Sequence, residues 1–312
     1  MSVARKKLHF TSGRDECAAW HYPGTNGCCV IMAGPIAVTK EPGTDIFAKR
    51  FHAAGLSVLA FDYRHLGESG GMPRQVVRIA EQLDDWRAAI EFASGLPEVD
   101  PGKLVLWGHS LSAGHVLHSA AHLPGVAAAI AQSPHADGLA ISRNASRHQK
   151  PLSMLRFTGR ALLDAAVGLV GKPPLLVPLV GAPGSVAALT TPDAADMPHA
   201  LDPDGRYRDW QQTVAARSAL RTGFYSPGRH AARVRCPLLV IACDDDQSAL
   251  AEPAVRVARR APQAELVRLP GGHYAPYLSA HAEAVEAELS FLRRHLLDLG
   301  SAETQGCGSG GI

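Results

Sequence analysis

The chain has 312 residues, of which 46% are hydrophobic, so it can bury a sizeable core and is long enough for one large α/β domain with an insertion. Its 31 basic and 29 acidic residues give a formal net charge of +2 without a block of like charge, which argues against a nucleic acid or an anionic membrane as partner. No run of about 18 apolar residues predicts a membrane span. Because residues 1–10 also lack the apolar centre of a signal peptide, we expect a cytoplasmic protein.

The six cysteines are scattered along the chain. Two of them, Cys28 and Cys29, are adjacent within an expected strand. Neighbouring side chains on a strand point to opposite faces and are poorly placed to form a bridge. We therefore expect reduced, buried thiols.

The first part of the chain alternates short apolar strands with amphipathic helices. Residues 7–22 predict a β-hairpin at an antiparallel edge, because two extended pieces flank the turn-rich Thr11-Ser-Gly-Arg-Asp. Strands are expected at 28–33, 56–61 and 104–107, and helices at 45–54, 75–93 and 111–121. This alternation predicts a mostly parallel, doubly wound sheet of about eight strands, with helices on both faces.

The pattern changes after an expected strand at 126–131. Residues 133–230 are rich in proline and glycine and show one helical stretch, at 155–170, so we interpret them as an insertion without sheet. Strands at 237–242 and 264–269 and helices at 252–260 and 280–299 then resume the alternation. The predicted core is therefore 1–132 with 231–299, the predicted cap is 133–230, and 300–312 is expected to be a disordered tail.

One stretch, Gly108-His-Ser110-Leu-Ser112, lies on the turn between an expected strand and the helix after it. A serine in so tight a turn needs small residues two positions before and after it, and Gly108 and Ser112 meet that need. Ser110 is the candidate nucleophile, although the G-x-S-x-G pattern has serine in place of its last glycine. Two alternatives are an ordinary helix-capping role for Ser110 and an offset motif in which Ser112 is the nucleophile.

A nucleophilic serine needs a base, and the base needs a third group that fixes its tautomer. The carboxyl ends of parallel strands meet at one crevice, so residues that follow strands are the candidates. His273 follows the last expected strand on a glycine-rich loop, and Asp244, Asp245 and Asp246 follow the strand before it. The aspartates could also form a solvated loop or a metal site.

An oxyanion hole needs two backbone N–H groups that point at the developing charge. Leu111, directly after the candidate nucleophile, is expected to supply one of them. The second is expected from the loop after the strand at 28–33. Because Pro35 has no N–H, Ile36 is the better donor there and Gly34 the weaker choice.

Two motifs make the chain resemble the α/β-hydrolase superfamily, and in particular its bacterial esterase and peptidase-like members. The first is Phe61-Asp-Tyr-Arg64-His-Leu-Gly67-Glu-Ser-Gly-Gly-Met-Pro-Arg74, and the second is the elbow Trp107-Gly-His-Ser110-Leu-Ser-Ala-Gly114-His. The resemblance runs from Leu8 to Leu296 and is thin in the insertion, which in this superfamily is a cap or lid that shapes the acyl or leaving-group pocket. At the oxyanion loop the chain departs from many relatives, which have His-Gly where Gly34-Pro35 stands.

The resemblance implies a role for each candidate. Ser110 is the nucleophile, His273 the base, and Leu111 and Ile36 the oxyanion donors. For the orienting acid we choose Asp246, with Asp244 in reserve, because members of the superfamily commonly place the acid one step beyond a preceding aspartate in a D-x-D pattern.

Other side chains support weaker hypotheses. His115, His118 and His122 share one helical face, as a metal site requires, but no cysteine or carboxylate lies at ligand spacing beside them, so we expect neither a metal nor a cofactor. Arg64, Glu68 and Arg74 are interpreted as a structural charge network. The insertion also contains histidine and aromatic side chains that could either line the pocket or hold the cap together. They are His135, His199, Tyr207, Trp210 and Tyr225.

These observations favour a serine hydrolase that forms an acyl-enzyme with a small to medium, mostly uncharged carboxylic ester or thioester. The expected partner is thus a small acyl substrate, and a homodimer is left open. The same residues could transfer the acyl group to an alcohol or amine, or cleave a carbon–carbon bond. A hypothesis of a different class is a non-catalytic protein of this fold that binds a ligand.

Overall fold

The computed structural model describes residues 5–297 of the chain. Eight strands form one sheet in the order β1-β2-β4-β3-β5-β6-β9-β10. β1 (Lys6–Ser12) and β2 (Asp15–Tyr22) form an antiparallel hairpin, and β2 also pairs antiparallel with β4 (Ser57–Phe61). The remaining neighbours are parallel. The predicted α/β-hydrolase architecture, with its antiparallel edge, is confirmed.

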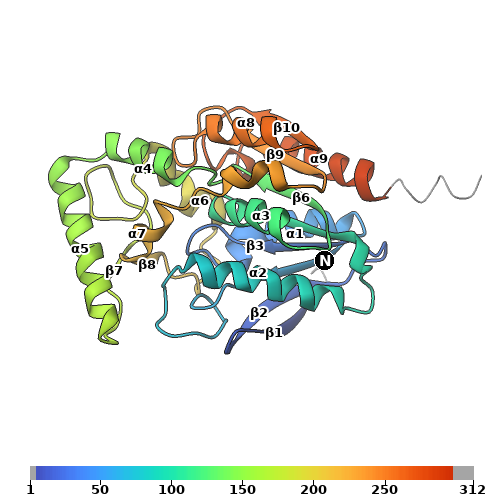
Figure 1. Ribbon diagram of the computed structural model, residues 1–312, viewed down its shortest axis with the longest axis horizontal. Coiled ribbons are helices and arrows are strands. Elements are labelled where there is room, and N and C mark those ends of the chain that lie inside the picture. The colour runs from blue at the N-terminus through green and yellow to red at the C-terminus, as the bar shows by residue number, and fades with distance from the viewer. Residues whose placement is uncertain (1–4, 298–312) are drawn as a thin grey trace, which may run out of the picture.

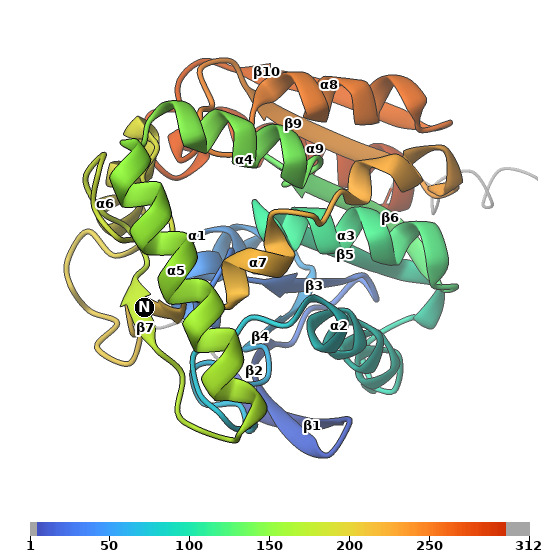
Figure 2. The same ribbon diagram turned by 60° about the vertical axis from the view of Figure 1, so that its left-hand side comes forward.

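Helices cover both faces of this sheet (Figures 1 and 2). On β3 (Cys29–Ala33), Val30 and Met32 belong to a buried cluster with residues of α1 and α9, whereas Ile31 and Ala33 belong to a second cluster with residues of α2, α3 and α8. This division follows from the period of two along a strand. The helices are α1 (Lys40–Ala53), α2 (Ile79–Ser94), α3 (Leu111–His122), α8 (Ala251–Arg260) and α9 (His281–Leu292), and the other strands are β5 (Leu104–His109), β6 (Val126–Gln132), β9 (Leu238–Cys243) and β10 (Ala264–Leu269).

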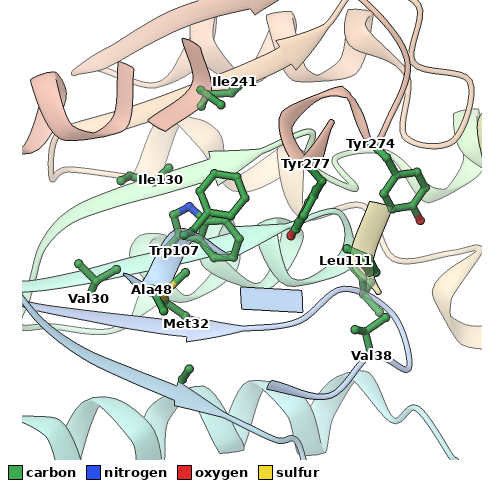
Figure 3. Close-up of a cluster of buried hydrophobic side chains, with 14 of the residues drawn as sticks. Val30, Met32, Val38, Ala48, Trp107, Leu111, Ile130, Ile241, Tyr274 and Tyr277 are labelled. Atoms are coloured by element: carbon green, nitrogen blue, oxygen red, sulfur yellow. The ribbon is translucent and has the colours of Figure 1, made fainter. Parts of the chain in front are cut away.

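The centre of the sheet is fully buried. Trp107 on β5 lies in register between Met32 of β3 and Ile130 of β6 (Figure 3). Its indole N–H donates to the Oε1 of Glu288 on α9, at 2.8 Å. Burial raises the pKa of Glu288 to about 8 even though this hydrogen bond lowers it, so the carboxyl stays protonated at neutral pH.

The five described cysteines form no disulfide. Cys17, Cys28, Cys29 and Cys243 are buried, and Cys236 is half-buried. Cys28 and Cys29 belong to the two opposite clusters, as expected for adjacent residues at the start of a strand. Burial raises the pKa of the Cys28 thiol to about 12, which keeps it protonated and unreactive.

Two helices, α1 and α2, begin at other residues than the sequence predicted. α1 begins at Lys40 rather than at residue 45, because the backbone N–H and the ammonium of Lys40 both bind the carboxylate of Asp62, at 2.6 and 2.8 Å. α2 begins at Ile79 rather than at residue 75. Gln75 has a positive φ of 61°, and its side-chain amide donates to the carbonyl oxygen of Thr213 at 2.7 Å, so this segment supports the insertion instead of starting a helix.

The chain between β6 and β9 stands at the carboxyl end of the sheet, with α5 as its outermost element (Figures 1 and 2). The predicted helix at 155–170 is α5 (Pro151–Leu169). The expectation that this segment contains no sheet is wrong, because β7 (Leu176–Pro178) and β8 (Thr213–Ala215) pair antiparallel. The sequence also did not reveal α4 (Gly138–Arg147), α6 (Met197–Leu201) and α7 (Ser218–Thr222), since such short helices carry little periodic signal.

Among residues 5–297, no helix combines the length and the hydropathy that a membrane crossing requires. α9 ends at Leu292, earlier than expected, and a π-helical turn follows at Arg293–Leu297. The predicted tail at 300–312 and the end of the helix expected at 280–299 lie outside the described residues.

Candidate active site

Ser110 lies on a strained turn between β5 and α3, with φ 58° and ψ −120°. The turn is tight enough to require glycine at 108, where a Cβ would come within 2.6 Å of the backbone carbon of Ser112. The Ser110 N–H donates to the Gln132 carbonyl of β6 at 3.0 Å, and its own carbonyl accepts from the His135 N–H at 2.9 Å. These contacts hold the side chain at the wall of a cavity that Ser110 lines.

Ser112, the other serine of the elbow, is buried and is not among the residues that line this cavity. Its hydroxyl donates to the carbonyl oxygen of Gly34 and shares a hydrogen bond of 2.6 Å with the hydroxyl of Tyr63. Tyr63 in turn accepts from the indole N–H of Trp86 at 2.9 Å. Its enclosure and these bonds argue against the offset motif in which Ser112 is the nucleophile.

His273 is buried and is paired with one of the three candidate aspartates. Its Nδ1 lies 2.8 Å from the Oδ2 of Asp246. The other oxygen of Asp246 accepts the N–H groups of Ser248 and Ala249, at 2.8 and 2.7 Å. Asp244 instead forms an exposed ion pair with Arg268 at 2.7 Å. Asp246, the first choice for the orienting acid, therefore contacts the histidine, whereas Asp244, the second choice, lies at the surface.

The surroundings of His273 favour its protonated form. Burial by itself lowers the pKa of this histidine, but the charge and hydrogen bond of Asp246, together with the charge of Asp193, outweigh burial and raise it. A second histidine, His109, packs its ring 4.6 Å from the ring of His273. Burial and the neighbouring His273 hold the pKa of His109 well below its ordinary value, so it is a neutral neighbour.

Both candidate oxyanion donors, Ile36 and Leu111, line the cavity beside Ser110. Within residues 5–297, neither backbone N–H donates to another protein group. The loop that carries Ile36 passes close to α1, where a Cβ at Gly43 would lie 2.6 Å from the Cα of Gly34. Because Ser112 binds the Gly34 carbonyl, the two departures from the superfamily pattern, Ser112 and Gly34-Pro35, contact each other.

The cavity has a volume of about 380 Å³. Core residues form one side of it, and the rest of its wall comes from the insertion, including Phe157 and Ala161 of α5. Among the described residues that line it, none is Asp, Glu, Lys or Arg. Such a wall suits an uncharged, largely apolar ligand. The core residues are Ile36, Ser110, Leu111, Ser248, His273 and Tyr274.

Most of the ring side chains singled out in the insertion attach it to the core. Of the five, His135 lines the cavity. Tyr207 donates to Asp45 at 3.1 Å, and the indole of Trp210 donates to the Ala37 carbonyl at 3.2 Å. Tyr225 donates to the Gly114 carbonyl at 3.3 Å, whereas His199 is exposed and does not reach the cavity.

The three histidines of α3 do not act as one group. His115 is buried and bonds to Gln82 and Tyr225, at 2.9 and 3.0 Å. His118 and His122 stack on each other with ring centroids 4.3 Å apart. In the part of the chain that the structure describes, no three His, Cys, Asp or Glu side chains are arranged to hold a metal ion.

The predicted charge network after β4 consists of separate contacts. Arg64 pairs with Asp85 at 2.5 Å, and Glu68 pairs with the ammonium of Lys40 at 2.6 Å. Arg74 donates to backbone carbonyls of its own loop, including that of Gly67 at 2.5 Å. These side chains brace the loop, and none of them lines the cavity.

Sequence reasoning missed Asp193, a buried residue of the insertion. Its carboxylate accepts hydrogen bonds from the loops that carry Asp246 and His273. The only local signal is the turn-forming Thr191-Pro-Asp193, which predicts a bend and gives no partner.

Comparison with known proteins identifies the family. A sequence profile described as "Alpha/beta hydrolase family" matches residues 44–288. The chain belongs to this family. Among curated proteins, this alpha/beta hydrolase is similar to "Quorum-quenching protein AidA" of Acinetobacter baumannii (strain MDR-ZJ06), with 36% identity over 291 residues that cover 92% of the chain and 94% of the relative.

Two further proteins resemble this alpha/beta hydrolase. "Thiohydrolase apmlB" of Arthrinium phaeospermum is 34% identical over 131 residues, which are 42% of the chain and 40% of that protein. Among solved structures, alpha/beta hydrolase GrgF from Penicillium sp. sh18 superposes with a TM-score of 0.79 at 23% identity, over 94% of this chain and 99% of that one. The structural likeness concerns the fold.

Proposed function

We propose that this alpha/beta hydrolase is a serine hydrolase with Ser110 as nucleophile, His273 as base and Asp246 as the acid that orients the imidazole. The observation that carries the proposal is the 2.8 Å contact between His273 and Asp246, formed beside a cavity that Ser110 and His273 both line. Nucleophilic acyl transfer needs a serine on a strained strand-to-helix turn and a carboxylate-bound histidine at the same cavity.

The reaction proceeds in two halves. In acylation, the Ser110 oxygen attacks the substrate carbonyl, its proton passes to His273, and the leaving alcohol or thiol departs with that proton. In deacylation, water attacks the acyl-enzyme, His273 takes its proton, and the serine is regenerated as the acid is released. The N–H groups of Leu111 and Ile36 receive the oxyanion in both halves.

The substrate that we propose is a small to medium, uncharged carboxylic ester or thioester. The apolar wall and the volume of about 380 Å³ support an acyl chain rather than a charged polymer. The similarity to a protein named as a thiohydrolase supports the inclusion of thioesters.

Labelling with a fluorophosphonate probe tests the proposal. We expect labelling of the wild type, none of Ser110→Ala, and slower labelling of Ser112→Ala, because the latter keeps the nucleophile and loses the hydrogen bonds of its hydroxyl to the Gly34 carbonyl and the Tyr63 hydroxyl. A wild type that is never labelled would favour the non-catalytic binding protein. Labelling that survives in Ser110→Ala would place the nucleophile elsewhere.

A second candidate function concerns the same residues with a narrower substrate. The relative with 36% identity is named as a quorum-quenching protein, which favours a small signalling molecule with an ester or lactone carbonyl. A panel of p-nitrophenyl esters, acyl-CoA thioesters and acylated lactones of increasing chain length separates the candidates. Addition of an alcohol or amine to the same assays measures transfer of the acyl group against hydrolysis.

A further inference from the structure

We propose that Asp193, which belongs to the insertion, is a positioning residue for the proposed triad: it joins the loop of Asp246 to the loop of His273 and stabilises the positive charge that His273 acquires during the reaction. The inference rests on the proposed function, since it assigns His273 the role of base. It assigns a part in the chemistry to a segment otherwise regarded as a cap over the substrate.

The contacts of Asp193 connect three segments that are far apart in sequence. Its Oδ2 accepts the N–H of Gln247 at 2.7 Å, the N–H of Ser248 at 3.2 Å and the N–H of His273 at 3.2 Å. Its Oδ1 accepts the hydroxyl of Ser248 at 2.8 Å, and that hydroxyl also bonds to Thr191, at 2.7 Å. One carboxylate from the insertion thus holds the residues next to Asp246 and the backbone of the histidine itself.

The fit between these loops depends on close approach. Asp193 is buried, with 9% of its surface exposed. A Cβ at Gly272, the residue before the histidine, would lie 3.1 Å from the Cβ of Asp193, a distance tighter than most packing contacts allow. The glycine at 272 therefore lets the histidine loop come close enough for its N–H to reach the carboxylate.

The titratable groups around His273 differ in charge: Asp193 is ionised, whereas His109 and His135 are neutral. Burial alone raises the pKa of Asp193, but the charge of His273 and the hydrogen bonds from the Gln247 N–H, the Ser248 hydroxyl and the His273 N–H outweigh burial, so the pKa lies below its ordinary value and the group is ionised at neutral pH. Burial lowers the pKa of His135 to about 4, and His109 is also held neutral. The titratable side chains that face His273 are Asp193, Asp246, His109, His135 and Tyr274.

Two carboxylates therefore act on one imidazole from different sides. Asp246 binds Nδ1 and fixes the tautomer, whereas Asp193 binds the backbone and adds its charge without touching the ring. When His273 takes the serine proton, the imidazolium forms in a buried site where each nearby negative charge counts more than it does in water. Loss of Asp193 should disturb both the position and the proton affinity of the base.

The test is the pH dependence of kcat/KM for a p-nitrophenyl ester in Asp193→Asn, with Asp196→Asn as the matched control on an exposed residue of the same turn. We expect kcat/KM to fall by about ten- to a hundred-fold, mainly through kcat. The acid limb should move to lower pH, because an imidazole that loses a nearby negative charge deprotonates more readily. Asp196→Asn should behave as the wild type.

The outcomes separate this inference from the proposed function. A wild type without activity or fluorophosphonate labelling contradicts the function itself. An active wild type whose acid limb and kcat are unchanged in Asp193→Asn overturns the role of Asp193. If that variant does not fold, Ser248→Ala takes its place: it removes one donor and keeps the charge, so we expect a smaller rate loss with an unmoved acid limb, and a full rate would contradict the positioning role.

Discussion

The carboxyl edge of the sheet and the insertion above it are built in different ways. At the carboxyl edge, Ser110 follows the fully buried strand β5, and His273, itself buried, lies on the loop after the outermost strand β10. The insertion contains short helices, a two-stranded sheet and many loops, and its long helix α5 turns Phe157 and Ala161 toward the cavity. The outer face of α5 exposes 70% of Leu155 and 57% of Leu162.

This difference assigns separate tasks to the two regions. Parallel strands place backbone and side chains within narrow limits, which bond-making chemistry requires. The insertion supplies most of the wall against which a substrate packs, and its sequence can vary without moving the serine. Asp193 is the proposed exception, since this residue of the insertion binds the loops that carry Asp246 and His273. The following predictions test how far this separation holds.

The largest effect is expected at the sheet edge itself. Asp246→Asn should lower kcat by roughly 10⁴-fold, because an amide cannot hold the histidine in the tautomer that accepts the serine proton. Asp244→Asn, which removes only an exposed ion pair with Arg268, should change kcat little. Steady-state rates with one ester decide between them, and the reverse result would exchange their roles.

A large effect on stability, confined to the insertion, is expected from Asp164→Ala. Asp164 is fully buried and accepts the N–H groups of Leu175 and Arg217, at 2.7 and 2.8 Å, while pairing with the Arg217 guanidinium. The substitution leaves the mostly buried guanidinium of Arg217 without its carboxylate, which should lower the free energy of unfolding by about 3–5 kcal/mol.

Amide hydrogen exchange shows which segments of the chain lose stability in this variant. Amides of residues 138–222 should exchange faster in Asp164→Ala, while β5 and β9 keep their protection. Asp204→Ala, which breaks an exposed pair with Arg206, is the control. Equal loss of protection in the core strands would mean that the two regions unfold as one.

A smaller effect on stability is expected at Glu288 of α9, which binds Trp107 of β5. Glu288→Gln should change the pH dependence of the free energy of unfolding. The folded pKa of Glu288 is raised to about 8 by burial, whereas the unfolded carboxyl ionises near its ordinary value of 4.5. Between these values the folded state binds the extra proton, so stability falls as pH rises through this window. Glutamine keeps an acceptor for Trp107 and cannot ionise, so the variant should gain a few kcal/mol over wild type at pH 8 and little at pH 4. Thermal unfolding across this range checks the slope, and parallel curves would contradict it.

The smallest effect concerns substrate choice. Ala161→Phe, on the inner face of α5, should lower kcat/KM for long-chain esters about ten-fold relative to acetyl esters, because the larger ring shortens the cavity. Ala166→Phe, on the exposed face of the same helix, should leave the ratio unchanged. A chain-length profile that is equal in the two variants would mean that α5 does not limit the acyl chain.

Much of the core was predictable because its signals are local. Apolar strands and amphipathic helices follow from side-chain periodicity, and the strained turn at Ser110 follows from Gly108 and a small residue at 112. The helix expected at 75–93 exists, but its predicted start was wrong: it begins at Ile79, because Val76 and Val77 are buried before it and the Val77 N–H donates to Ser218 of the insertion. The apolar period of a sequence indicates which side chains are buried, but it does not show which segment of the chain covers them.

The sequence by itself determined the order of strands and helices in the core, the elbow around Ser110 and a short set of candidate partners for it. These follow from interactions between residues close in the chain. Only the tertiary structure decided that Asp246 rather than Asp244 meets His273, that Ser112 binds Gly34 and Tyr63, and that Asp193 joins the loops of Asp246 and His273. Those contacts join segments that are far apart in the chain, and which donor meets which acceptor depends on how the strands and loops pack.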